Sequence, residues 1–195
     1  MKGRRAALAA TAWALAGCAG IAGGGGPAAY ALDPTHTSVT FEVAHFGTST
    51  SRGRFERAQG SVQLDRAAGK GRAEITIATA SVSTGVPVLD SRLRGPEALD
   101  SEAFPTATFV SERFVFTGDA VIAVAGSLTL RGRTLPLTLK ATHFDCYLSP
   151  LLAHQVCGGD FEATLQRSRW GIDFGLSLGI PDEVRLLVQV EAIRQ

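Results

Sequence analysis

The sequence predicts an all-β domain that closes into a barrel, and two features carry this prediction. Apolar and polar residues alternate in short runs through most of the chain, which is the period of a strand with one buried face. Turn sequences containing glycine, such as 67–71, 117–119 and 131–133, separate these runs and are typical of hairpin connections. Closure removes the free strand edges of such a meander, so we expect an antiparallel barrel of about eight strands rather than a sandwich.

The alternating runs follow one another closely from residue 39 onward. A barrel of this size encloses room for packed side chains or for one small ligand. Modest residues such as Ala73, Gly126 and Ala163 occupy many expected inward positions, which favours a cavity. In chain order the runs cover 39–45, 62–64, 73–77, 107–109, 114–116, 122–130, 135–139, 161–165 and 184–190.

One internal segment breaks the strand pattern. Residues 88–103 show no alternation of apolar and polar residues. Because glycine followed by proline ends a helix, we expect one or two short helical turns that break at Gly95 and Pro96. The segment is therefore predicted to be a short helical insertion in the barrel.

The N-terminal 17 residues predict export as a signal peptide. Three basic residues precede the apolar run 6–16, which has the length of a signal-peptide core and is too short to span a bilayer. Leu15 to Cys18 looks like a bacterial lipobox, which predicts cleavage before Cys18 and lipidation of its thiol. Residues 18–29 would then be the lipidated cysteine and a glycine-rich spacer. Cleavage near 29–31, which would leave a soluble exported protein, is the alternative.

The lipobox also predicts where the protein resides. Stable anchoring takes more than one acyl chain, and a lipoprotein cysteine carries more than one. Ala19 follows Cys18 in place of the aspartate that typically retains lipoproteins at the inner membrane. We therefore expect a periplasmic protein attached to the outer membrane through its lipid anchor.

Composition argues against several functions for the single domain expected at residues 30–195. The whole chain has 19 basic and 18 acidic residues and a net charge of +1, and no basic run lies outside the leader, so nucleic acid is not an expected partner. Neither His-Glu-x-x-His nor a phosphate-binding loop is present. We expect neither an enzyme nor a cofactor, and the sequence leaves a homodimer open.

Cys146 and Cys157 remain as an even pair once Cys18 is lipidated. Because disulfides persist in exported proteins, a disulfide between them is expected. The spacing His-x-x-Cys occurs twice, with His143 and His154, and a tetrahedral zinc site is the alternative. Export favours oxidation of the pair, so no metal is expected.

Several segments spread over residues 30–195 resemble the YceI-like, polyisoprenoid-binding family. The resemblance implies an extended, lipocalin-like barrel whose apolar tunnel holds a polyisoprenoid or another long-chain lipid, and it implies a carrier. Two segments depart from the family pattern, which usually reads Arg-Asp-x-His-Leu at 89–93 and Arg-Ser-Asp-aromatic-Gly at 167–171; both departures bear on how a head group is held. The matching segments are 30–47 (YALDPTHTSVTFEVAHFG), 53–55, 60–65, 83–85, 104–109 (FPTATF), 124–136, 167–172 and 182–184.

The candidate ligand-contacting residues are those expected inside the barrel or beside its short helix. His45 shares the parity of Phe41 and could bond a head group, or be satisfied by a neighbouring strand or loop. Arg167 shares the parity of Leu165 and could grip a phosphate or carboxylate, or form a buried pair with Asp90 or Asp173. His36 has the opposite parity and is expected to hydrogen-bond locally at the rim. The candidate set is Phe41, His45, Phe55, Asp90, Arg92, Phe109, Arg167 and Trp170, in which the aromatic residues are core residues first.

A second function is also compatible with the sequence. In it the barrel is filled by side chains, and the protein is an envelope interaction module that docks a membrane quinone or cytochrome partner. A long-chain lipid that co-purifies with the protein would separate the two hypotheses.

Overall fold

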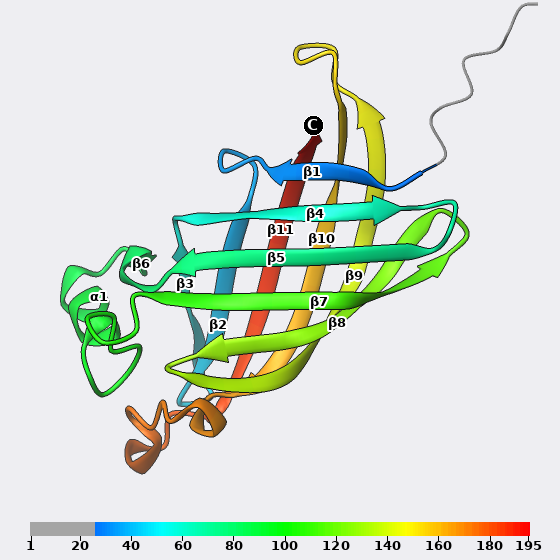
Figure 1. The fold of residues 1–195 in the computed structure, drawn as a ribbon. Helices are drawn as coiled ribbons and strands as arrows, with labels where there is room; N and C mark the ends of the chain where they lie inside the picture. The colour runs from blue at the N-terminus through cyan, green and yellow to red at the C-terminus, as the bar shows by residue number, and fades with distance from the viewer. Residues whose placement is uncertain (1–25) are drawn as a thin grey trace, which may run out of the picture.

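The computed structural model describes residues 26–195 as a closed antiparallel barrel (Figure 1). The predicted signal peptide and Cys18 lie outside the described residues. The ring of eight strands runs β1-β4-β5-β7-β8-β9-β10-β11 and returns to β1, which confirms the expected all-β, lipocalin-like barrel. The strands are β1 (Ala28–Leu32), β2 (Ser38–His45), β3 (Ser49–Phe55), β4 (Ala58–Asp65), β5 (Lys70–Ala78), β6 (Val82–Ser83), β7 (Thr106–Thr117), β8 (Ala120–Leu130), β9 (Arg133–Leu148), β10 (Gln155–Gln166) and β11 (Glu183–Arg194).

Strand β11 closes the ring because two strands share its outer edge. Its last residues, 192–194, pair with β1, whereas residues 185–189 pair with β2. Strands β3 and β6 then extend the sheet beyond β2. The N-terminal and C-terminal strands of the domain therefore hold each other in place.

Strand β7 combines two of the predicted runs, 107–109 and 114–116. The ladder with β8 shifts between Val110 and Arg113, and Ser111 is buried at this bulge. A bulge sets an extra residue against the partner strand, so the inward face passes from odd positions to even positions along β7. The sequence alternation therefore broke into two runs although the strand is continuous.

A second irregularity overturns one expected inward position in β8. The β7–β8 ladder shifts again between Val115 and Phe116, next to the turn at Gly118. Val121 is consequently 1% exposed, whereas Ile122, which we expected to point inward, is 44% exposed.

Strands β1 and β3, and the two-residue strand β6, are the elements that the alternation did not show. β1 begins at Ala28, two residues before the expected start of the domain and within the expected spacer 18–29. β3 carries Gly53 where the ring of Phe41 from β2 lies across the sheet, and a Cβ atom at this position would overlap that ring. A glycine thus replaces the apolar residue that would have marked the strand.

The predicted helical insertion is confirmed as α1 (Pro87–Arg94). Pro87 occupies its first turn, and Gly95 follows its last residue, with the Gly95 amide donating to the Arg92 carbonyl at 3.0 Å. The following turn anchors the insertion through Ala98 and Leu99, which are buried. Within residues 26–195, no helix is long and apolar enough to cross a membrane.

Cys146 and Cys157 face each other across β9 and β10 and form a disulfide in the structure. His143 pairs with Asp160 on one side of the bridge, whereas His154 lies beyond β10 on the other. The two histidines are thus separated by several strand residues, at about 3.3 Å each, along the ladder. One zinc ion cannot bind both of them together with the two sulfur atoms, so the disulfide is the arrangement that the fold supports.

Candidate functional site

The barrel encloses an apolar cavity of about 120 Å³. Aliphatic and aromatic side chains from β1, β2, β4, β5 and β7 to β11 form its wall, among them Ala73, Phe109, Leu128 and Val190. A cavity of roughly 150 Å³ with such a lining stays free of water and binds small hydrocarbons in other proteins. The interior of this barrel is therefore suited to a hydrocarbon guest.

The polar side-chain groups of the cavity wall are two hydroxyls. Both are hydrogen-bonded to other residues of the protein. The Tyr30 hydroxyl donates to Oε1 of Gln155 at 2.9 Å. The Thr37 hydroxyl donates to the Glu191 carbonyl at 3.2 Å. No charged side chain belongs to the wall formed by the described residues. A charged head group thus has no partner within the cavity.

The predicted aromatic residues take different places around this cavity. Phe109 lines it, as expected. Phe41 and Phe55 stand outside its wall and contact each other, with ring centres 5.9 Å apart. Trp170 is 1% exposed and donates from Nε1 to the carbonyl of Leu128 at 3.2 Å. It therefore holds a residue of the cavity wall without lining the cavity itself. One of the four aromatic candidates is thus placed to touch a guest directly.

Arg167 is buried as its parity predicted, but its partners are backbone carbonyls and not a head group. The side chain is 6% exposed, and burial lowers the pKa of its guanidinium. Nε donates to Pro181, and Nη2 donates to Ile180, at 2.9 and 3.2 Å. Nη1 donates to the carbonyls of residues 172 and 174 at 3.1 and 2.6 Å. The expected pair with Asp90 or Asp173 is replaced by a clamp on the segment 172–181.

Asp182 anchors the other side of this segment. Its carboxylate accepts from the Ser168 amide at 2.7 Å and from the Ser168 hydroxyl at 2.6 Å. These hydrogen bonds, the hydroxyl first, lower the pKa of Asp182. Arg169, where the family pattern has aspartate, is exposed and takes no part in the clamp through its side chain.

His45 is exposed at the end of β2, so our expectation of a buried imidazole needing a polar partner was wrong. The strand ends at His45 because Phe46 and Gly47 take positive φ angles of 50° and 71° and turn the chain into β3. The alternation that suggested burial extends past the point where the barrel wall stops.

Asp90 and Arg92 lie on α1, outside the cavity wall. Asp90 accepts from the amide and the hydroxyl of Thr84 at 2.7 and 2.6 Å, and the hydroxyl bond is the main cause that lowers its pKa. The Arg92 guanidinium lies 6.0 Å from the centre of the Phe174 ring. Both residues fasten local loops to the helix.

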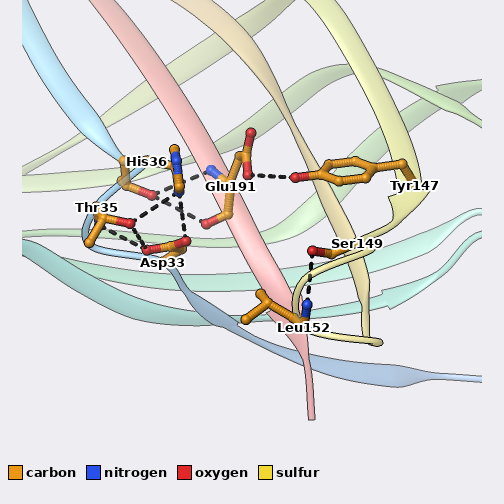
Figure 2. Close-up of polar contacts among 8 residues, drawn as sticks. Asp33, Thr35, His36, Tyr147, Ser149, Leu152 and Glu191 are labelled. Atoms are coloured by element: carbon orange, nitrogen blue, oxygen red, sulfur yellow. Dashed lines mark hydrogen bonds and ion pairs between the residues drawn. The ribbon is translucent and has the colours of Figure 1, made fainter.

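A polar corner at the β1 end of the barrel was only partly foreseen (Figure 2). His36 Nδ1 lies 2.8 Å from Asp33 Oδ2, which confirms the expected local bond of His36. The bond lowers the pKa of Asp33 to about 2 and raises the pKa of His36. Glu191 and Tyr147, joined at 3.2 Å, complete the corner. Sequence spacing gave no signal for these two, because they come from distant strands.

Asp33, His36 and Glu191 are the group in the described part of the chain whose ligand atoms lie close enough to hold a metal ion, within 4.8 Å of one another. Both oxygens of Asp33 are already engaged, one with Thr35 and the other with His36. The group is therefore a hydrogen-bonded corner that fastens the segment after β1 to β11.

The YceI-like domain model matches residues 30–192. The chain belongs to the YceI-like domain family. A UPF0312 protein of Pseudomonas aeruginosa is 35% identical over 161 residues, which cover 82% of this chain and 83% of the relative. A UPF0312 protein of Ectopseudomonas mendocina is 31% identical over 183 residues, which cover 92% of this chain and 94% of the relative.

Solved structures share the barrel fold. Burkholderia cenocepacia BcnA superposes with a TM-score of 0.65 at 23% identity over 82% of this chain and 98% of BcnA. A polyisoprenoid-binding domain from Saccharophagus degradans superposes with a TM-score of 0.61 at 18% identity over 86% of this chain and 99% of that domain. These likenesses extend over nearly the whole of both neighbours, so the closed barrel described here is the complete fold of each.

Replacing Arg167 with alanine is expected to destabilise the barrel strongly, because a buried side chain is lost and four partly buried carbonyls lose their donor. Buried groups left unsatisfied cost about 1–3 kcal/mol each, so we expect a loss of at least about 3 kcal/mol in urea unfolding. Arg169→Ala is the matched control and should change stability by no more than about 0.5 kcal/mol. Equal stability of the two variants would contradict the clamp.

The pKa of His36 is expected to lie above 6.5 in the folded protein, because the Asp33 carboxylate stabilises the protonated imidazole. A raised folded pKa means that the contact stabilises the fold below about 6.5 and that this contribution is lost as the pH rises through the folded value. The lowered pKa of Asp33 means that its contribution is lost as the pH falls towards about 2. An NMR titration should show the His36 pKa falling back in Asp33→Asn, and an unchanged value would contradict the pairing.

Proposed function

We propose that the protein is an exported carrier that holds a polyisoprenoid or a similar long-chain amphiphile inside the barrel. The observation that carries this proposal is a closed ring of strands around an apolar cavity of about 120 Å³. Each methylene that leaves water for such a place contributes about 0.8 kcal/mol. Membership of the YceI-like family and the polyisoprenoid-binding structural neighbour support the choice of ligand class.

A long chain requires the cavity to widen. Pockets for drug-sized ligands span about 300–1,000 Å³, several times the present volume. Phe114, Phe144 and Phe161 line the cavity and are only partly buried, so rotation of their rings would enlarge it. We propose that these rings swing away when the guest enters.

The head group of the guest belongs at one end of the barrel, because the wall offers no charged partner. Tyr30 and Thr37 supply the polar atoms of the wall, and both lie next to β11 where β1 and the following segment cross it. We propose that the head group rests beside these hydroxyls. His45 and Arg167 are not needed for the grip, since one is exposed at the end of a strand and the other is occupied by carbonyls.

The proposed anchor is a lipidated Cys18, which would hold the protein in the periplasm on the outer membrane. Ala28, the first residue of β1, lies ten residue steps after Cys18. At up to about 3.5 Å per residue, this connection spans at most about 35 Å. The barrel would thus remain within roughly its own length of the bilayer, where long-chain lipids are found.

Protein purified without added lipid should yield a long-chain amphiphile on extraction with organic solvent and mass spectrometry. Ala73→Phe should reduce the amount recovered, because Ala73 is 5% exposed and lines the cavity, which a phenyl ring would largely fill. Ala68→Phe, in the exposed β4–β5 turn, is the matched control. Circular dichroism verifies that both variants fold, and Val190→Phe serves as a second filling variant.

Recovery of the same lipid from the cavity-filling variants as from the wild type would show that the guest lies elsewhere. Absence of any lipid would favour the alternative of an envelope module that docks a quinone or cytochrome partner through its outer surface.

Cells fed labelled palmitate should incorporate the label into the wild type and not into Cys18→Ala, because that thiol is the acceptor in the lipobox. The wild type should then fractionate with the outer membrane. An unlabelled wild type that is found in the soluble periplasmic fraction would contradict the anchor.

A further inference from the structure

We propose that the turn between β9 and β10 inserts leucine side chains into the surface of the lipid bilayer and docks the barrel there. The leucine tip is defined as Leu148, Leu151 and Leu152. This inference rests on the proposed function because it names the surface from which the guest is taken, but it is tested separately from lipid binding.

The leucine tip exposes apolar surface that the barrel itself does not use. Leu151 is 94% exposed, Leu148 72% and Leu152 46%. From Cys146 to Gly159 the sequence holds no Asp, Glu, Lys or Arg. Concentrated apolar exposure without charge marks a contact surface, and a bilayer accepts it without the matched shape that a protein partner needs.

The turn is held in one shape, so it presents the leucines in a fixed way. Ser149 is 6% exposed, and its amide donates to the His154 carbonyl at 2.9 Å. The Ser149 hydroxyl accepts from the Leu152 amide at 3.3 Å (Figure 2). The Ser149 carbonyl accepts from the Ala153 amide at 2.9 Å. Little conformational freedom is therefore left to lose when the tip enters the lipid.

The path of the chain indicates that the partner of the leucine tip is the membrane. The Tyr30 hydroxyl of β1 bonds Gln155 at the base of the hairpin, and the Gln195 amide donates to the Ala29 carbonyl at 2.9 Å. His154 in turn bonds the Arg194 carbonyl at 2.9 Å. The described part of the chain thus begins beside the base of the hairpin, which projects past β1 on the side of the C-terminus (Figure 1).

Docking in this orientation would turn the cavity towards the bilayer. Tyr30 and Thr37, where we place the head group, lie at the same end of the barrel as the leucine tip. A guest could then pass between bilayer and barrel with little exposure to water. The lipid anchor would limit the distance, and the tip would set the orientation.

Tryptophan fluorescence with bromine-labelled acyl chains tests the insertion. Leu151→Trp, in the full chain purified from the cell envelope, is mixed with phosphatidylethanolamine–phosphatidylglycerol vesicles. Leu178→Trp is the matched control, because Leu178 is 70% exposed and precedes β11 at the opposite end of the barrel. Trp170 is buried and contributes the same background to both. We expect a blue shift and quenching for Leu151→Trp and neither for Leu178→Trp.

Partitioning gives a second measure. In the Cys18→Ala chain, Leu151→Asp should lower the partition coefficient between vesicles and water roughly tenfold, because the substitution removes an apolar side chain from the inserted surface. Leu178→Asp should leave it unchanged. Absence of quenching at Leu151→Trp overturns the proposal whether or not the protein floats with the vesicles, as does equal quenching at both ends. Lipid recovered by extraction alongside either result would leave the carrier function intact.

Discussion

The pairing of β1 with β11 is the contact on which the rest of the structure depends. Residues 30–32 pair with 192–194, so the two ends of the domain close the ring and leave a cavity inside it. The segment after β1 is fastened across β11 because the Glu191 carbonyl accepts from the Asp33 amide at 2.9 Å and from the Thr37 hydroxyl. Without this closure the sheet would have free edges, and the cavity would be a groove open to water.

Much of the barrel was predictable because a strand with one buried face has a period of two residues. The alternation failed where the backbone departs from that period, as at the β7 bulge by Ser111 and at Gly53 in β3. Burial of Arg167 followed from parity, but its partners did not, because they come from a loop whose path no local pattern encodes. The prediction that His45 is buried was wrong for the opposite reason. There the alternation of the sequence continues to the end of β2, where the strand is already exposed to solvent.

The two ends of the barrel carry different features. The 172–181 segment, fastened by Arg167 and Asp182, lies at the end where β11 begins. Tyr30, Thr37, the Asp33–His36 pair and the leucine tip lie where β1 crosses β11. In the proposed function, the end fastened by Arg167 and Asp182 would stay fixed, and the end that bears the leucine tip would face the lipid.

The central claim is that an apolar guest occupies the interior of the barrel. A crystal structure of the protein purified from the cell envelope, without added lipid, tests it most directly. The account predicts continuous elongated density between Phe109, Leu128 and Val190, with the rings of Phe114, Phe144 and Phe161 displaced outward. Side chains packed as they are here, around an empty cavity of about 120 Å³, would contradict it.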